Sequence, residues 1–137
     1  MANVDKAFGL RPYKGAGWPV QQANKYNISP ASGYGTSIFQ GDLCIFNGGQ
    51  LFLIQADGAS AVTCIGRNAD TDGIGGSTTT GVATRELDST SINTTLALQL
   101  KIVGVVQDDS NGDLTADNAN LVVLINEHYM RGGVAGT

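Results

Sequence analysis

The sequence offers few side chains of the kinds that perform catalysis. Its single histidine, His128, directly follows Glu127, and a Glu–His pair could serve in general acid–base chemistry. No Gly-x-Ser-x-Gly motif or other recognisable nucleophile context accompanies the pair. A lone histidine near the end of a chain is more often an ordinary surface residue. We therefore predict that the protein is not an enzyme and has no catalytic residues.

Two acidic turns have the composition of calcium loops. Residues 68–73, Asn-Ala-Asp-Thr-Asp-Gly, match the first half of an EF-hand loop, but the twelfth position is Thr79, where a bidentate glutamate is needed. Residues 108–113 are similarly ambiguous, because Asp, Asn and Gly also make ordinary turns. One histidine and two cysteines are too few for a zinc site. We predict no metal and no cofactor, with calcium binding by residues 67–81 left open.

The two cysteines, Cys44 and Cys64, each lie inside an apolar run. Free cysteine is among the most buried residue types, so we predict two buried, reduced thiols. A disulfide between neighbouring strands stays open, because its geometry cannot be judged from sequence.

Size, composition and charge restrict the class of protein. The chain has 137 residues, a length typical of one domain. It contains 19 glycines and only 15% charged residues, a composition that favours turns and β-structure over long helices. The net charge of −4 argues against a general nucleic-acid binder. The opening residues lack the apolar centre of a signal peptide, and no apolar run reaches the ~20 residues of a membrane span. We expect a soluble protein made in the cytoplasm.

The elements that would position these side chains are short strands. Turn signals, such as Asn47-Gly48 and Asp57-Gly58, separate apolar or alternating segments. Residues 67–81 contain almost nothing for a core and are predicted to be a long, exposed loop. The fold class is therefore all-β, a small β-barrel or β-sandwich of about seven strands. The predicted strands cover residues 23–28, 36–39, 43–46, 51–54, 61–65, 96–106 and 121–125.

Residues 1–19 differ from the rest and are predicted to form an extended N-terminal arm, with residues 20–137 as a single β domain. Pro12 and Pro19 bracket a glycine-rich stretch, which disfavours a helix or a central strand. Residues 1–25 carry four basic groups against one acidic group, and the remainder carries a net charge of −7. This asymmetry suggests an arm that docks on an acidic surface, although a frayed, solvated terminus stays open.

The opening residues 1–12, Met-Ala-Asn-Val-Asp-Lys-Ala-Phe-Gly-Leu-Arg-Pro, resemble the start of a family of small head proteins from tailed bacteriophages. Residues 25–28 and 38–42 resemble that family's next block, and residues 104–106 and 117–125 are similar in placement. The resemblance implies a decoration (cement) protein that sits on the outer surface of the capsid. It implies a virion location after synthesis in the host cytoplasm.

Large apolar groups on an extended segment suggest that the arm lies in a groove, either on its own domain or on a neighbour, and the arm is the predicted attachment element. The partners expected are the major capsid protein and other copies of the chain, with a trimer favoured and a dimer possible. We predict no nucleic-acid partner and no membrane partner. The predicted capsid or inter-subunit binding residues are Phe8, Leu10, Arg11, Tyr13 and Trp18.

Two other classes of protein stay open. One is a different virion part, a head–tail connector or a tail-tube subunit, which would form a symmetric ring in solution. The other is a β domain that binds a small ligand or a carbohydrate, which would place Trp18, Tyr26 and Tyr34 around a pocket.

Overall fold

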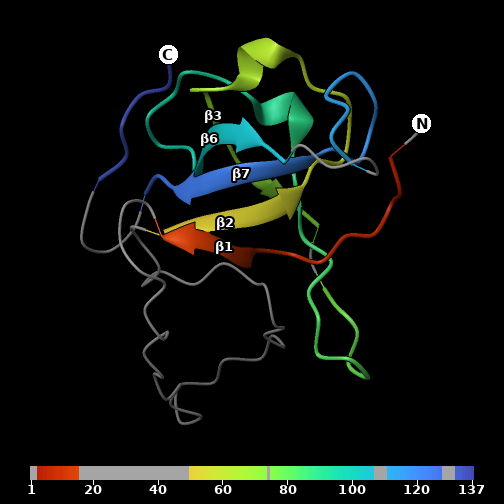
Figure 1. Ribbon diagram of the computed structural model, residues 1–137. Helices are drawn as coiled ribbons and strands as arrows, with labels where there is room; N and C mark the ends of the chain where they lie inside the picture. Colours follow the sequence, from red (N-terminus) through yellow and green to blue (C-terminus); the bar gives the residue numbers. More distant parts are fainter. Residues whose placement is uncertain (1–2, 16–49, 74, 107–110, 128–131) are drawn as a thin grey trace, which may run out of the picture.

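The computed structural model describes residues 3–15, 50–73, 75–106, 111–127 and 132–137, and these residues form antiparallel β-structure (Figure 1). The all-β prediction is confirmed. The main sheet has five strands in the order β1-β2-β7-β6-β3, and β4 pairs with β5 in a second sheet. The strands are β1 (Arg11–Gly15), β2 (Gln50–Gln55), β3 (Asn68–Ala69), β4 (Thr71–Asp72), β5 (Glu86–Leu87), β6 (Leu100–Val105) and β7 (Asn120–Ile125). Two 3-10 turns, η2 (Val62–Cys64) and η3 (Ser89–Ser91), lie between them.

Strand β7 lies at the centre of the main sheet and pairs on both sides (Figure 1). Val123 faces Phe52 across the β2–β7 pair and Ile102 across the β6–β7 pair. A strand that lies between two others is shielded from water, so this central position suits the apolar run from Leu121 to Ile125. The sequence prediction of strands at 51–54 and 121–125 is confirmed.

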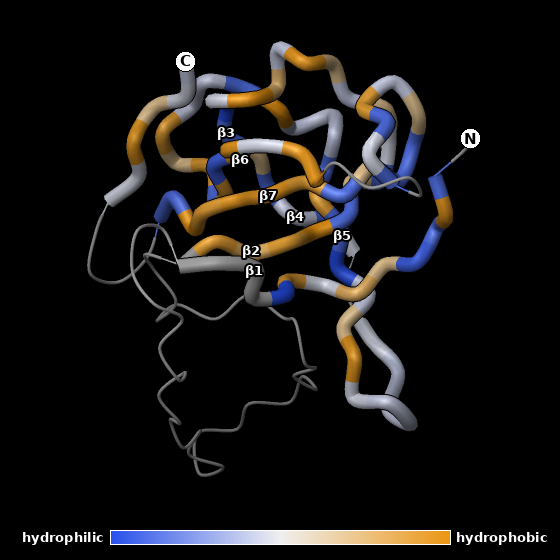
Figure 2. Tube along the Cα trace, in the orientation of Figure 1, coloured by the Kyte–Doolittle hydropathy of each residue, from blue (hydrophilic) through white to orange (hydrophobic). Residues whose placement is uncertain are grey.

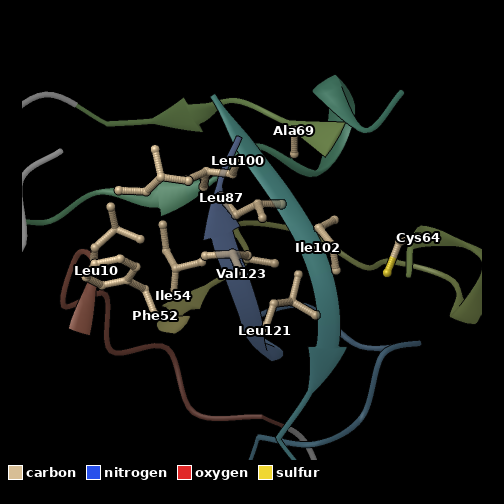
Figure 3. Packing of buried hydrophobic residues seen from close by; sticks show 12 residues of the cluster. Leu10, Phe52, Ile54, Cys64, Ala69, Leu87, Leu100, Ile102, Leu121 and Val123 are labelled. Carbon is tan, nitrogen blue, oxygen red and sulfur yellow. The ribbon is translucent and has the colours of Figure 1, made fainter. Parts of the chain in front are cut away.

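The core gathers side chains from both sheets around β7 (Figure 3). Figure 2 shows that the trace along β2 and β7 is predominantly hydrophobic. In Figure 3, Leu10 and Phe52 lie at one end of this cluster and Cys64 at the other. The buried side chains of the cluster are Leu10, Phe52, Ile54, Ala56, Cys64, Ala69, Leu87, Leu100, Ile102, Leu121, Val123 and Ile125.

Two predicted strands differ from those observed. Strand β6 begins at Leu100 instead of Leu96, because the Asn126 side chain donates Nδ2 hydrogen bonds to the Leu96 and Leu98 carbonyls at 2.9 and 3.0 Å. The segment around Cys64 forms η2 and not a strand, and its Val62 side chain is exposed. The alternation of apolar and polar residues from Leu96 therefore predicted a strand that is longer than β6. The apolar, β-branched residues around Cys64 predicted a strand where the chain forms η2.

The prediction of a fully exposed loop at 67–81 is wrong at its start. Asn68 and Ala69 are completely buried in β3. The later part is a hairpin that projects from the body of the domain (Figure 1), and its tip, residues 78–81, is exposed as predicted. Backbone bonds across it run from Ser77 N to the Val82 carbonyl and from Gly81 N to the Ser77 carbonyl.

The described part of the predicted arm belongs to the domain itself. The expectation that Phe8 and Leu10 lie on an arm outside the core is wrong: each is 7% exposed, and the edge strand β1 pairs with β2. Proline is tolerated here because β1 is the terminal strand of the sheet order, and the ladder is irregular between Pro12 and Lys14. The sequence argument excluded a central strand but not an edge strand.

Several predictions fall outside the described residues. The predicted strands at 23–28, 36–39 and 43–46 are among them. So are the positions of Trp18, Tyr26 and Tyr34, the state of Cys44 and the role of His128.

Cys64 is described and is a buried free thiol. The described residues contain no helix long and apolar enough to cross a membrane.

Candidate functional site

The N-terminal segment, residues 3–10, is held against the domain by buried side-chain amides. Gln55, at the end of β2, is 1% exposed. Its Nε2 donates to the Val4 carbonyl at 2.9 Å, and its Oε1 accepts from the Lys6 backbone N–H at 2.8 Å. Asn111 Nδ2 also donates to the Val4 carbonyl, at 2.9 Å. These bonds replace the missing strand ladder and fix the backbone of the segment.

Further contacts fix both ends of the N-terminal segment. At its start, Asn3 Nδ2 donates to the carbonyls of Asp113 and Asp117 at 2.9 and 2.7 Å. Near its end, Gly9 adopts φ +67°, a left-handed conformation that suits glycine, and its N–H donates to the Arg85 carbonyl at 3.2 Å. The segment is thereby positioned along its whole described length (Figure 1, red trace).

The side chains of the N-terminal segment divide between core and surface. Phe8 and Leu10 are buried, while Val4 is 57% exposed and Lys6 is exposed. The exposed Arg11 guanidinium carbon lies 4.2 Å from the centroid of the Phe8 ring, a cation–π contact that orients the guanidinium. Residues 4–11 therefore present exposed Val4, the Asp5 carboxylate and the two cations Lys6 and Arg11 on a fixed backbone.

A hollow of about 270 Å³ opens between the N-terminal segment and β2 and β7. One of its lining residues is Asn120, whose buried Oδ1 has no hydrogen-bond partner among the described residues. Two of its lining residues, Lys6 and Arg11, are cationic. The lining residues of this N-terminal hollow are Val4, Lys6, Phe8, Arg11, Gln55, Asn111 and Asn120.

Several carboxyl groups lie close to Glu86 in β5. Glu86 is directly opposite Asp72 in the β4–β5 pair. Burial raises the pKa of Glu86 above its ordinary value, and the negative charges of Asp5, Asp57 and Asp72 raise it further. Asp5, which belongs to the N-terminal segment, is thus one of the carboxylates that act on Glu86.

The structure separates the predicted binding residues into different groups. The side chains of Phe8 and Leu10 are buried in the domain, and Arg11 is exposed beside the N-terminal hollow. Tyr13 lies in β1, at the irregular position of the ladder. Trp18 is outside the described residues.

The sequence analysis missed the residues that fix this surface, above all Gln55 and Asn111. Gln55 ends β2 directly after the core residue Ile54, and nothing in the pattern of that strand marks its side chain as buried. Asn111 lies in a turn-like stretch where asparagine is ordinarily attributed to turn formation.

The carboxylates of Asp70, Asp72 and Asp113, the described ones of the two acidic turns, bond to nearby backbone and hydroxyl groups. Asp70 Oδ1 accepts from the Gln99 N–H at 3.2 Å, and Asp72 Oδ1 accepts from the Gly73 N–H. Asp113 Oδ1 accepts from the N–H and the hydroxyl of Thr115 at 2.9 and 2.7 Å, and these bonds lower the pKa of Asp113. In the described ranges, no group of three or more His, Cys, Asp or Glu side chains is placed to hold a metal ion.

Comparison with known proteins adds no relative. No protein-family model matches the chain, and the searches of curated proteins and of solved structures found no match. The functional argument therefore depends on the residues and their geometry.

Proposed function

We propose that this protein is a structural virion protein that decorates and stabilises the outer surface of a tailed-bacteriophage capsid. The observation that carries the proposal is the fixed surface of the N-terminal segment, where exposed Val4, Lys6 and Arg11 border one hollow. The resemblance of residues 1–12 to small phage head proteins is the second support. The complete β domain in this proposal is a small barrel or sandwich of about seven strands, and its copies assemble as trimers.

Attachment in this proposal uses a preorganised surface in place of a free arm. A segment already held by Gln55 and Asn111 loses little conformational freedom on binding, so less of the interaction free energy is spent on ordering it. Lys6 and Arg11 would attract acidic groups of the major capsid protein, and guanidinium–carboxylate pairs add directional hydrogen bonds. Val4 would supply apolar contact at the same place.

Co-sedimentation with heads of the phage that encodes the chain tests this function. The full chain should sediment with expanded heads and not with unexpanded proheads, since stabilisation requires binding to the mature lattice alone. The double variant Lys6→Gln/Arg11→Gln should bind at least about tenfold more weakly, and the wild-type protein should bind more weakly as salt rises. Lys101→Gln removes one positive charge from β6, outside the N-terminal segment, and controls for the loss of a positive charge as such.

Three outcomes would overturn the proposal or its site. Absence of binding to either kind of head rejects the decoration function. Tight binding by the Lys6→Gln/Arg11→Gln variant moves the attachment surface elsewhere on the domain. A closed ring of the free protein that binds the portal end of the particle identifies a connector or a tail-tube subunit.

A further inference from the structure

A second hollow, of about 210 Å³, lies beside η2 and η3 and shares no lining residue with the N-terminal hollow. It is much larger than the volume of one liquid water molecule, about 30 Å³. Its lining is rich in hydroxyl groups and contains one thiol and one cation. The lining residues of this η2–η3 hollow are Ala59, Ser60, Ala61, Thr63, Cys64, Arg67, Ser89 and Ile92.

Ser60 supplies a hydroxyl donor that no other described residue uses. Its side chain is 8% exposed, and its buried Oγ has no hydrogen-bond partner. The backbone at this residue is fixed, because the Ser60 N–H donates to the Leu114 carbonyl at 2.8 Å. Buried hydroxyl groups normally have a partner, so an unused one at a hollow indicates a missing ligand or water.

Arg67 supplies the positive charge of the η2–η3 hollow. Its backbone N–H donates to the Cys64 carbonyl at 3.0 Å, and its carbonyl accepts from the Ile102 N–H at 2.9 Å. These bonds place the half-buried side chain at the end of η2. Its charge also acts on the Cys64 thiol: burial raises the pKa of that thiol, and Arg67 opposes the increase.

The remaining groups of the η2–η3 hollow favour a negatively charged ligand. None of the lining residues is acidic. Two neighbouring carboxylates are engaged with the backbone: Asp57 Oδ1 accepts from the Ser89 N–H at 2.9 Å, and Asp88 Oδ1 accepts from the Thr90 N–H at 2.8 Å. Thr63 and Ser89 add further hydroxyl groups that could donate to oxygen atoms of a ligand.

We propose that the η2–η3 hollow is a binding site for a small oxyanion, a carboxylate or a phosphate group. Arg67 is the counter-ion, and Ser60 Oγ is the buried donor that the ligand satisfies. Planar guanidinium groups bind both kinds of oxyanion through paired N–H donors. The η2–η3 hollow shares no residue with the N-terminal hollow, so a test of anion binding is independent of a test of capsid attachment.

Amide NMR titrations of the full chain test this site. Sodium phosphate and sodium acetate are added separately at constant ionic strength, with sodium chloride as the reference salt. Saturable shifts should concentrate at residues 59–67 and 89–92. A response to phosphate alone identifies a phosphate-type ligand, and a response to acetate identifies a carboxylate, such as an acidic side chain of a partner protein.

Variants separate binding from folding in this experiment. Arg67→Gln should abolish the saturable shifts. Ser60→Ala should weaken binding about tenfold without loss of thermal stability, because the hydroxyl has no partner among the described residues. Lys6→Gln/Arg11→Gln should leave the titration unchanged. The proposal is overturned if neither anion gives localised shifts at tens of millimolar, or if the shifts persist in Arg67→Gln.

Discussion

Gln55 Nε2 donates a hydrogen bond to the Val4 carbonyl at 2.9 Å, joining two residues that are 51 positions apart in the sequence. The same amide accepts from the Lys6 N–H, so one buried side chain satisfies both a donor and an acceptor of the N-terminal segment. This relationship converts what the sequence presents as an arm into part of the folded domain. The predictions that follow test its consequences and those of comparable contacts.

Gln55→Leu should lower the free energy of unfolding by about 1–3 kcal/mol, because it leaves the Lys6 N–H without its acceptor in a partly buried place. Asn111 still donates to the Val4 carbonyl in this variant, which limits the loss. Urea denaturation measures the effect. Gln99→Leu, at an exposed glutamine, is the control and should change stability by less than about 0.5 kcal/mol.

Leu10→Ala should destabilise the domain by about 2–5 kcal/mol, the usual cost of truncating a buried leucine. Val4→Ala, at an exposed position of the same segment, should cost less than about 0.5 kcal/mol. By the same reasoning, a chain without residues 1–19 should fail to fold stably. A cooperative thermal transition of that truncated chain near the wild-type temperature would contradict the structure.

Gly133→Ala should displace the C-terminal segment, residues 132–137. A Cβ atom at Gly133 would lie 1.8 Å from the Leu96 carbonyl oxygen, a backbone atom that cannot move away cheaply. The expected cost is about 1–3 kcal/mol. Hydrogen exchange of the Val134 amide should also accelerate, because its bond to Asn126 Oδ1 is lost.

Gly132→Ala is a matched control for this experiment, since a Cβ atom there meets nothing within 4 Å. Its stability and its Val134 exchange rate should equal those of the wild-type protein. Equal behaviour of the two alanine variants would show that the C-terminal segment is not docked as described.

Glu86→Gln should stabilise the protein at neutral pH and not in acid. The pKa of Glu86 is raised in the folded state by burial and by neighbouring carboxylates, so ionisation of this group disfavours folding. This loss of stability is absent well below the ordinary pKa of 4.5. It reaches its full size above the raised pKa of Glu86 in the folded state. Thermal unfolding of Glu86→Gln and wild type from pH 3 to 8 should therefore diverge as pH rises.

Glu127→Gln removes the same charge from an exposed residue after β7 and serves as the control for the pH series. It should follow the wild-type curve closely. A stabilisation of Glu86→Gln that is equally large at pH 3 would show that repacking, and not loss of charge, is its cause.

The fold could be predicted from sequence where the residues of a single segment show a strand pattern by themselves. The apolar runs of β2 and β7 were found because a strand between two others needs apolar residues at successive positions, as Leu121, Val122 and Val123 show. The start of β6 could not be found this way. Leu96 and Leu98 continue the alternation, but their carbonyls bond to the Asn126 side chain and not to a strand.

The candidate surface could be predicted in part. The charge and composition of the first 25 residues predicted that Arg11 and the apolar side chains near it are binding residues. They did not reveal that Phe8 and Leu10 face inward while Val4 and Lys6 face water, because burial depends on which surface the segment meets.

The amino-acid sequence by itself determined the all-β class, the strands nearest the centre of the sheet and the exposure of the 78–81 hairpin tip. Only the tertiary structure decided how both ends of the chain are attached. Gln55 and Asn111 hold the N-terminal segment, while Asn68 and Asn126 hold the C-terminal segment through Val134. A side-chain amide leaves no periodic pattern in sequence, and its hydrogen bonds become stabilising only when folding removes water from both partners.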